Sequence, residues 1–145
     1  MLVRMELSRI LIRELNDYQI IELREMRDAD SDASSPARSF PIVIGLPEAQ
    51  AIERRLKGIS IKRPQTHDLL GNIIEALGGM LRSITICDLA DSTFFATLDV
   101  EHNGELMHID ARPSDAIAIG IAQDVPVYVA DHVLNSALPT EEEES

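Results

Sequence analysis

A strand that runs directly into a helix constrains this chain more than any other stretch. The apolar run from Leu106 to Ile109 is typical of a strand end, and Pro113 follows it after three residues. Proline suits the first turn of a helix, because its missing N–H would have no helical partner there. Isoleucines and alanines fill positions 116–119, and Ile121 follows Gly120, which predicts a helix that is apolar on most sides and therefore buried. Polar groups gather at its start: Asp110, Arg112, Ser114 and Asp115.

Turn signals divide much of the remaining chain into hairpins. Asn16-Asp17 separates two alternating apolar segments, and the alternation of the first changes phase near Arg9, which favours a bulge or bend. Asn103-Gly104 is a strong two-residue turn signal. Three stretches have helical spacing: 47–57, 66–77 and the helix from Pro113. We therefore expect an α+β fold, with an antiparallel or mixed sheet built from hairpins and three main helices packed on it.

The length and the ends of the chain suggest one domain with a tail. At 145 residues a single domain over 1–135 is expected, followed by an acidic, disordered tail over 136–145. The stretch 27–38 is rich in Asp, Ser and Ala and is expected to form an exposed loop. Thr66 is the expected N-cap of the second helix. A short strand over 125–129 and a helical turn near Val133 complete the interpretation.

Charge and cysteine content limit the classes of function. The net charge of −12 argues against loose, non-specific binding to nucleic acid, which relies on Lys and Arg. Eleven of the thirteen basic residues are Arg, a bias that suits fixed contacts to carboxylate or phosphate groups. The single cysteine fits a reducing compartment, and no apolar run approaches the roughly 20 residues that span a bilayer. We expect a cytoplasmic protein without a membrane partner.

Two segments share a pattern that carries the candidate chemistry. Arg63-Pro64 and Arg112-Pro113 each precede an apolar helix whose first turn holds a hydroxyl residue and an aspartate. The plainer interpretation is capping of two helices, since Asp and hydroxyl side chains are favourable at helix starts. Salt bridges between Arg and Asp are a second structural interpretation. The common zinc and nucleotide signatures, such as H-E-x-x-H and the Walker loop, do not occur in the sequence.

The functional interpretation requires that the two helix starts meet in space. Arginines and hydroxyl groups would then bind a phosphate with the help of helix N–H groups: Arg63, Thr66, Arg112 and Ser114. Three aspartates are candidate ligands for a divalent metal such as Mg²⁺ or Mn²⁺: Asp68, Asp110 and Asp115. His67 could transfer a proton or bind that metal. Together, His67, Asp68, Asp110 and Asp115 are the candidate catalytic residues of a phosphodiester hydrolase.

At these residues the chain resembles the bifunctional nuclease domain family. Three segments carry the resemblance: Phe40 to Gly45 with Glu48-Ala49, Arg63 to Leu70, and Asp110 to Ile117. The resemblance covers roughly residues 1 to 135. It implies a compact α+β domain that often forms a dimer, neighbouring Arg-Pro segments, and nuclease activity on DNA and RNA. The competing hypothesis is a non-catalytic dimeric module that binds a small anionic ligand or a partner protein.

Overall fold

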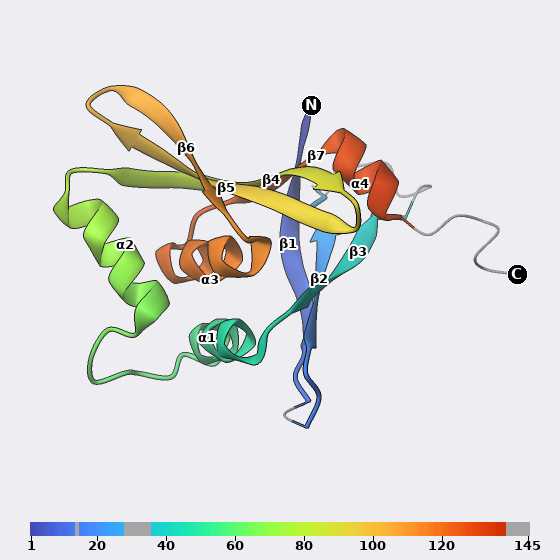
Figure 1. The fold of residues 1–145 in the computed structure, drawn as a ribbon, viewed down its shortest axis with the longest axis horizontal. Helices are drawn as coiled ribbons and strands as arrows, with labels where there is room; N and C mark the ends of the chain where they lie inside the picture. Colours follow the sequence, from blue (N-terminus) through green and yellow to red (C-terminus); the bar gives the residue numbers. More distant parts are fainter. Residues whose placement is uncertain (14, 28–35, 139–145) are drawn as a thin grey trace, which may run out of the picture.

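A computed structural model describes residues 1–13, 15–27 and 36–138 of the chain, which fold into one mixed sheet and four helices (Figure 1). The strands and helices follow one another along the chain as β1 (Leu2–Leu11), β2 (Gln19–Glu25), β3 (Ser39–Ile44), α1 (Leu46–Leu56), α2 (Thr66–Ala76), β4 (Met80–Ala90), β5 (Thr93–His102), β6 (Glu105–Ala111), α3 (Pro113–Gln123), β7 (Val127–Ala130) and α4 (Asp131–Ala137).

Two groups of strands are joined into one sheet by β7. The strand order is β3-β2-β1-β7-β4-β5-β6, and the groups β1–β3 and β4–β6 are antiparallel throughout. β7 is antiparallel to β1 and parallel to β4, so the last strand of the chain closes the gap between the two groups. Figure 1 shows the strong twist, with β1 and β2 running nearly at right angles to β4 and β5.

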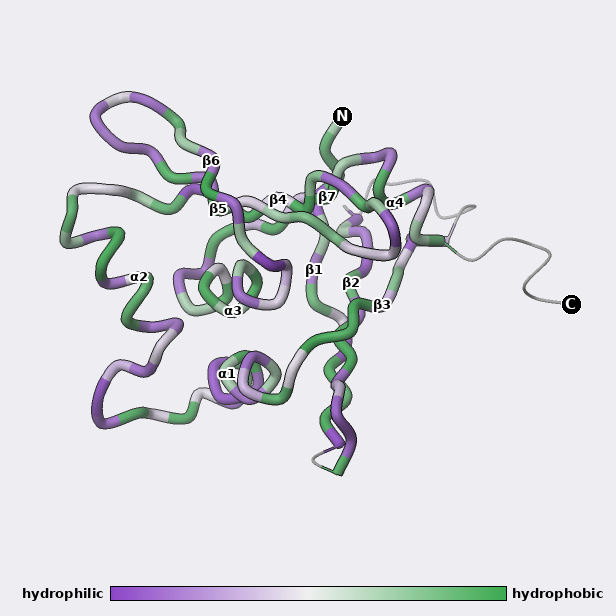
Figure 2. The backbone as a smooth tube through the Cα atoms, in the orientation of Figure 1, coloured by the Kyte–Doolittle hydropathy of each residue, from purple (hydrophilic) through white to green (hydrophobic). Residues whose placement is uncertain are grey.

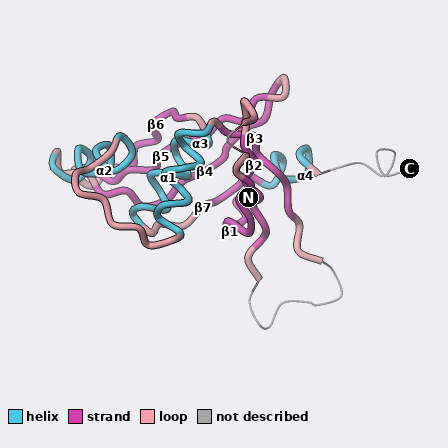
Figure 3. The backbone as a smooth tube through the Cα atoms, turned by 90° about the horizontal axis from the view of Figure 1, so that it is seen from below, coloured by secondary structure: helices cyan, strands magenta, loops and turns pink. Residues whose placement is uncertain are grey.

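Helix α3 is the buried centre of the helical layer. It packs on α1, α2, β4 and β5, and Ala116 to Gly120 are buried. Gly120 lies so close to β4 that an added Cβ would come within 2.6 Å of Ile84 Cγ1, which places the helix axis unusually near the sheet. The helices α1, α2 and α3 lie together, while α4 lies apart from them against β3, β4 and β7 (Figures 1 and 3).

The structure confirms the predicted α+β class, both hairpins and the three main helices. The bulge expected near Arg9 is present, because the β1–β2 register shifts between Leu7 and Arg9. One prediction was wrong: Gln65, not Thr66, is the N-cap of α2. The predicted turn near Val133 is part of the seven-residue helix α4, which extends past residue 135. The predicted tail over 139–145 and most of the predicted loop, over 28–35, lie outside the described residues.

Candidate functional site

The first turns of α2 and α3 meet through one side-chain pair. His67 Nε2 lies 2.9 Å from Asp115 Oδ1, and only 14% of the His67 side chain is exposed. His67 lies three positions after Pro64, and Asp115 lies two positions after Pro113, so each closely follows an Arg-Pro segment. The helix starts are therefore neighbours, as the functional interpretation of the sequence requires.

Arg112 fixes the position of Asp115 from the other side. Its Nε donates to Asp115 Oδ2 at 2.9 Å, and its Nη2 donates to Glu48 Oε1 at 2.5 Å. Glu48 belongs to the first turn of α1. The salt-bridge interpretation of the sequence therefore holds for Arg112, whose guanidinium is already occupied by two carboxylates. The resulting chain of contacts runs from Glu48 through Arg112 and Asp115 to His67. It connects α1, α3 and α2.

The charged side chains of this network differ in how deeply they are buried. Glu48 is buried, and its Oε2 has no hydrogen-bond partner among the described residues. The pKa of Arg112 is raised by its hydrogen bonds to Asp115 and to Glu48. Burial alone would raise the pKa of Asp115, but hydrogen bonds from Arg112 and His67 outweigh it and leave that pKa below its usual value. Asp115 is therefore ionised at neutral pH.

An ionised Asp115 sets the tautomer of His67. A carboxylate can only accept hydrogen bonds, so Nε2 of His67 carries the proton of the 2.9 Å contact. In the neutral imidazole, Nδ1 is then the nitrogen with a free lone pair. This arrangement is that of a general base held in place by a carboxylate.

Asp68 and Thr66 take structural positions at the start of α2. The backbone N–H of Gln65 donates to Asp68 Oδ2 at 3.1 Å, so the capping interpretation is correct for Asp68. Asp68 also lines the neighbouring pocket. Thr66 is the first helical residue and is exposed.

Three other predicted site residues take no part in the His67–Asp115 contact. Asp110 pairs with Thr97 in the β5–β6 register, two positions from the pairing of Asp99 with His108. Side chains of opposed residues share a face of the sheet, so Asp110 lies on the face that carries the Asp99–His108 contact, whereas α3 packs on the opposite face, against Ile84. Ser114 is buried at the start of α3, and Arg63 is exposed in the loop before α2.

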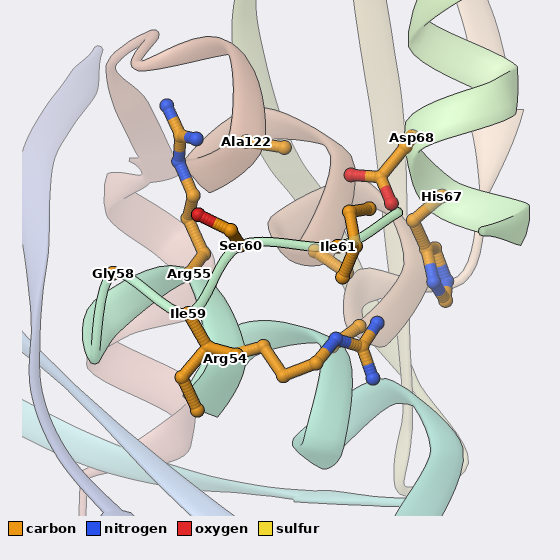
Figure 4. Close-up of a pocket in the computed structure, with 11 residues that line it drawn as sticks. Arg54, Arg55, Gly58, Ile59, Ser60, Ile61, His67, Asp68 and Ala122 are labelled. Carbon is orange, nitrogen blue, oxygen red and sulfur yellow. The ribbon is translucent and has the colours of Figure 1, made fainter. Parts of the chain in front are cut away.

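A pocket opens beside His67, between α1, α2 and α3 (Figure 4). Its volume is about 330 Å³. Four lining residues are small and leave this space open: Ala51, Gly58, Ala118 and Ala122. In Figure 4 the guanidinium of Arg54 lies toward His67, whereas Arg55 extends past Ser60. The loop residues Ile59 and Ile61 complete the wall, together with Asp68.

Sequence reasoning missed three charged residues of this region. Arg54 and Arg55 line the pocket, and Glu48 holds Arg112. The pocket is lined by Ala51, Arg54 and Arg55 of α1 and by Gly58 just after it, at the i, i+3, i+4, i+7 spacing of one helix face. That spacing was a usable signal for the arginines. No comparable signal marks Glu48, because an acidic residue in a first turn is ordinary.

The donors of the site do not form the predicted metal-binding set. Both Asp115 oxygens already accept hydrogen bonds, one from His67 and one from Arg112. Asp68 caps a helix, and Asp110 lies on the other face of the sheet. Within the described parts of the chain, no three His, Cys, Asp or Glu side chains are grouped as a metal site would need. The arrangement therefore does not fit a cation held by Asp68, Asp110 and Asp115.

Fold and site together define an α+β domain with a carboxylate-supported histidine beside a cationic pocket. The model of the bifunctional nuclease domain family matches residues 31–142, which include α1, α2, α3 and α4 as well as the pocket. The chain belongs to the bifunctional nuclease domain family, as its Arg-Pro segments indicated.

Relatives of this chain include both uncharacterized and named proteins. The uncharacterized protein Rv1829 of Mycobacterium tuberculosis (strain H37Rv) is 40% identical over 122 residues, which cover 82% of this chain and 70% of the relative. Bifunctional nuclease 1 of rice (Oryza sativa subsp. japonica) is 26% identical over 93 residues, or 62% of this chain and 28% of the rice protein. None of the helices in the described parts of the chain combines the length and apolar character needed to cross a bilayer.

Proposed function

We propose that this protein is a nuclease that hydrolyses phosphodiester bonds of DNA or RNA at the pocket beside His67. Family membership supports the class of reaction, and the carboxylate-supported imidazole supports the place. The observation that carries the proposal is the 2.9 Å contact between His67 and Asp115 at the wall of a pocket with two arginines. A non-catalytic binding module would not need a histidine of fixed tautomer there.

The residues present can support a hydrolytic step. His67 Nδ1 accepts a proton from a water whose oxygen attacks phosphorus, and Asp115 stabilises the imidazolium that forms. The bond from phosphorus to the departing sugar oxygen breaks, and solvent protonates that oxygen while His67 returns its proton to solvent. Guanidinium groups near the phosphoryl oxygens stabilise the charge that develops in the transition state.

A cleavage assay on supercoiled plasmid and on single-stranded RNA tests this proposal. Wild-type protein is compared with His67→Ala and Asp115→Asn, each purified identically to control for contaminating nucleases. General-base catalysis typically contributes about 10²–10⁴-fold to a rate, so the cleavage rate of each variant should be lower than that of wild type by a factor in this range. His132→Ala is the matched control, because His132 is an exposed histidine of α4 outside the pocket. Equal cleavage by wild type and His67→Ala would refute the proposal.

Dependence on Mg²⁺ or Mn²⁺ stays a prediction of the sequence. The occupied carboxylates of the site do not support it. The same assay with Mg²⁺, Mn²⁺ or EDTA decides the question. Cleavage that persists in EDTA and is lost with His67→Ala fits the side-chain chemistry above. Cleavage that requires a metal would mean that Asp115 or Asp68 exchanges its present partners for a cation.

We also propose that the protein forms a homodimer through α2 and β6. Large apolar side chains on these two elements are 39–74% exposed: Leu69, Leu70, Ile73, Leu77, Leu106, Met107 and Ile109. Figure 2 shows hydrophobic segments recurring along α2, which lies at the margin of the molecule. β6 is an edge strand, and an edge offers free backbone groups to a second strand. Antiparallel pairing of two β6 strands, centred on His108, would place Met107 opposite Ile109 of the second copy. No two carboxylates would face each other across this pairing.

Light scattering coupled to gel filtration tests the dimer. Met107→Glu and Ile73→Glu should yield monomers, since each would bury a charge in the proposed contact. Val43→Glu is the control, because Val43 is 61% exposed on β3, the other edge of the sheet. A monomeric wild type, or a dimer that survives both α2 and β6 variants, would contradict this interface.

The proposed compartment is the cytoplasm. A single cysteine, Cys87, supports it, because disulfide frameworks are a feature of oxidising compartments. Fractionation of the native host with an antibody to this chain is the test.

A further inference from the structure

The pocket holds two cations that the network around His67 does not use. Arg54 and Arg55 make no side-chain hydrogen bond or ion pair with another described residue, whereas Arg112 is bound by two carboxylates. In a chain of net charge −12, these two neighbouring arginines bring positive charge without a bound carboxylate to one pocket, which Asp68 also lines. Their place is the same cavity that His67 lines.

We propose that Arg54 and Arg55 form the phosphate-binding site of this protein and that the pocket admits one unpaired nucleotide of a single strand. The inference rests on the proposed nuclease function and names its substrate class. It moves the phosphate contacts to one face of α1 and away from the residues that the sequence favoured: Arg63, Thr66, Arg112 and Ser114. Guanidinium groups suit this task because they bind phosphoryl oxygens in a bidentate way.

The shape of the pocket selects for an unpaired nucleotide. Its volume of about 330 Å³ is at the lower end of the roughly 300–1,000 Å³ of small-ligand pockets. Ile59 and Ile61, in the loop that follows α1, line the same pocket and offer apolar side chains to a base or sugar. Bases in a duplex are stacked and paired, so only an unpaired nucleotide can place its phosphate on the arginines and its base in the pocket.

The charge of the protein favours the same substrate. Duplex binding depends on many Lys and Arg contacts to phosphates along the backbone. Here the net charge is −12, and the pocket is lined by two arginines that have no acidic partner among the described residues. A short contact with one or two phosphates avoids the repulsion that a long polyanion would meet on the rest of the surface.

Binding of fluorescent oligonucleotides, measured by anisotropy, tests the site without relying on cleavage. The probes are a single-stranded hexanucleotide, a blunt duplex of the same sequence and a nucleoside monophosphate as competitor, and gels confirm that they stay intact. We expect Arg54→Ala/Arg55→Ala to weaken hexanucleotide binding at least tenfold and to lower the salt dependence, by about 0.7 in slope for each lost phosphate contact. Wild type should bind the duplex at least tenfold more weakly than the single strand.

A charge-matched double variant separates this site from the general field of the protein. Arg24→Ala/Arg82→Ala also removes two positive charges, from exposed ion pairs on β2 and β4 outside the pocket. It should change the affinity less than threefold. Equal losses for the two double variants, or duplex binding as tight as single-strand binding, would overturn the inference. A monophosphate that competes as well as the hexanucleotide would also overturn the assignment to a nucleic-acid strand.

Two results distinguish this inference from the proposed function. Arginine-dependent binding by a wild type that cleaves nothing would refute the nuclease while the binding site stands. Cleavage by the wild type with an unchanged kcat/KM in Arg54→Ala/Arg55→Ala would refute the binding site while the nuclease stands.

Discussion

Asp115 accepts a hydrogen bond from His67 across 48 positions of sequence, at 2.9 Å. This contact joins the first turns of α2 and α3 and sets the histidine at the wall of the pocket. The other carboxylate oxygen of Asp115 accepts a hydrogen bond from Arg112, which in turn donates to buried Glu48. The position of the imidazole therefore depends on a carboxylate three contacts away in α1.

Substitution of Arg112 and substitution of Glu48, which form one ion pair, should lower the free energy of unfolding by different amounts. Arg112→Ala leaves Glu48 buried without a partner, and we expect a loss of about 2 kcal/mol in the free energy of unfolding. The figure is at the low end because Arg112 is 66% exposed. Glu48→Gln leaves an exposed arginine that water can solvate, so it should cost under about 1 kcal/mol. Urea unfolding measures both values.

The double variant is the control for this interpretation. Arg112→Ala/Glu48→Gln removes the unpaired buried charge and should be more stable than Arg112→Ala alone. Additive losses, or a larger loss for Glu48→Gln than for Arg112→Ala, would contradict the account of the pair.

Two glycines make opposite predictions for substitution by alanine. A Cβ on Gly120 would meet Ile84 Cγ1 at 2.6 Å inside the core, so Gly120→Ala should cost about 1–3 kcal/mol through overpacking. A Cβ on Gly71 would meet only the end of the exposed Gln123 side chain, which can move. Gly71→Ala should be neutral or stabilising by up to about 1 kcal/mol, because alanine is the better helix former. Thermal unfolding of both variants makes the comparison, and equal effects would contradict it.

The buried carboxylate of Asp99 predicts how stability depends on acid. Burial would raise the pKa of Asp99, but hydrogen bonds from Thr85, Ser83, His108 and Thr97 leave it below the usual value. The unfolded chain then takes up this proton first, at a pKa of about 3.9. The stabilisation is present above that pH and is lost as the pH falls through the lower, folded pKa.

Unfolding by urea between about pH 6 and pH 3 measures this contribution. Wild type should lose stability more steeply on acidification than Asp99→Asn, which has no carboxyl to protonate there. The variant itself should be less stable at neutral pH by about 1–3 kcal/mol, because an amide cannot accept all four hydrogen bonds. Equal acid slopes would show that another group controls the transition.

Local signals in the sequence predicted most elements but not how they assemble. Asn103-Gly104 gave the β5–β6 hairpin, and Pro113 gave the start of α3, because both depend on neighbours in the chain. The position of β7 between β1 and β4 depends on pairing across the whole chain. Thr66 lost the N-cap position because Gln65 and Asp68 together cap the helix start.

The candidate site was predicted in part for the same reason. The matching Arg-Pro segments led to His67 and Asp115, which the structure brings together. Asp110 is close to Asp115 in sequence, yet strand alternation sends it to the opposite face of the sheet. Arg54 gains its role only from the way α1 packs beside the start of α2. The helical spacing of Arg54 and Arg55 places them on one face of α1, but no linear motif shows which element packs beside that face.

A double-mutant cycle on cleavage tests the central claim most directly. The measurement is kcat/KM on a single-stranded oligonucleotide for wild type, His67→Ala, Asp115→Asn and the double variant. If the two residues act as one unit, the double variant should be no slower than His67→Ala alone, as expected for groups that share one function. Losses that multiply in the double variant, or single variants as active as wild type, would contradict the claim that Asp115 works through His67.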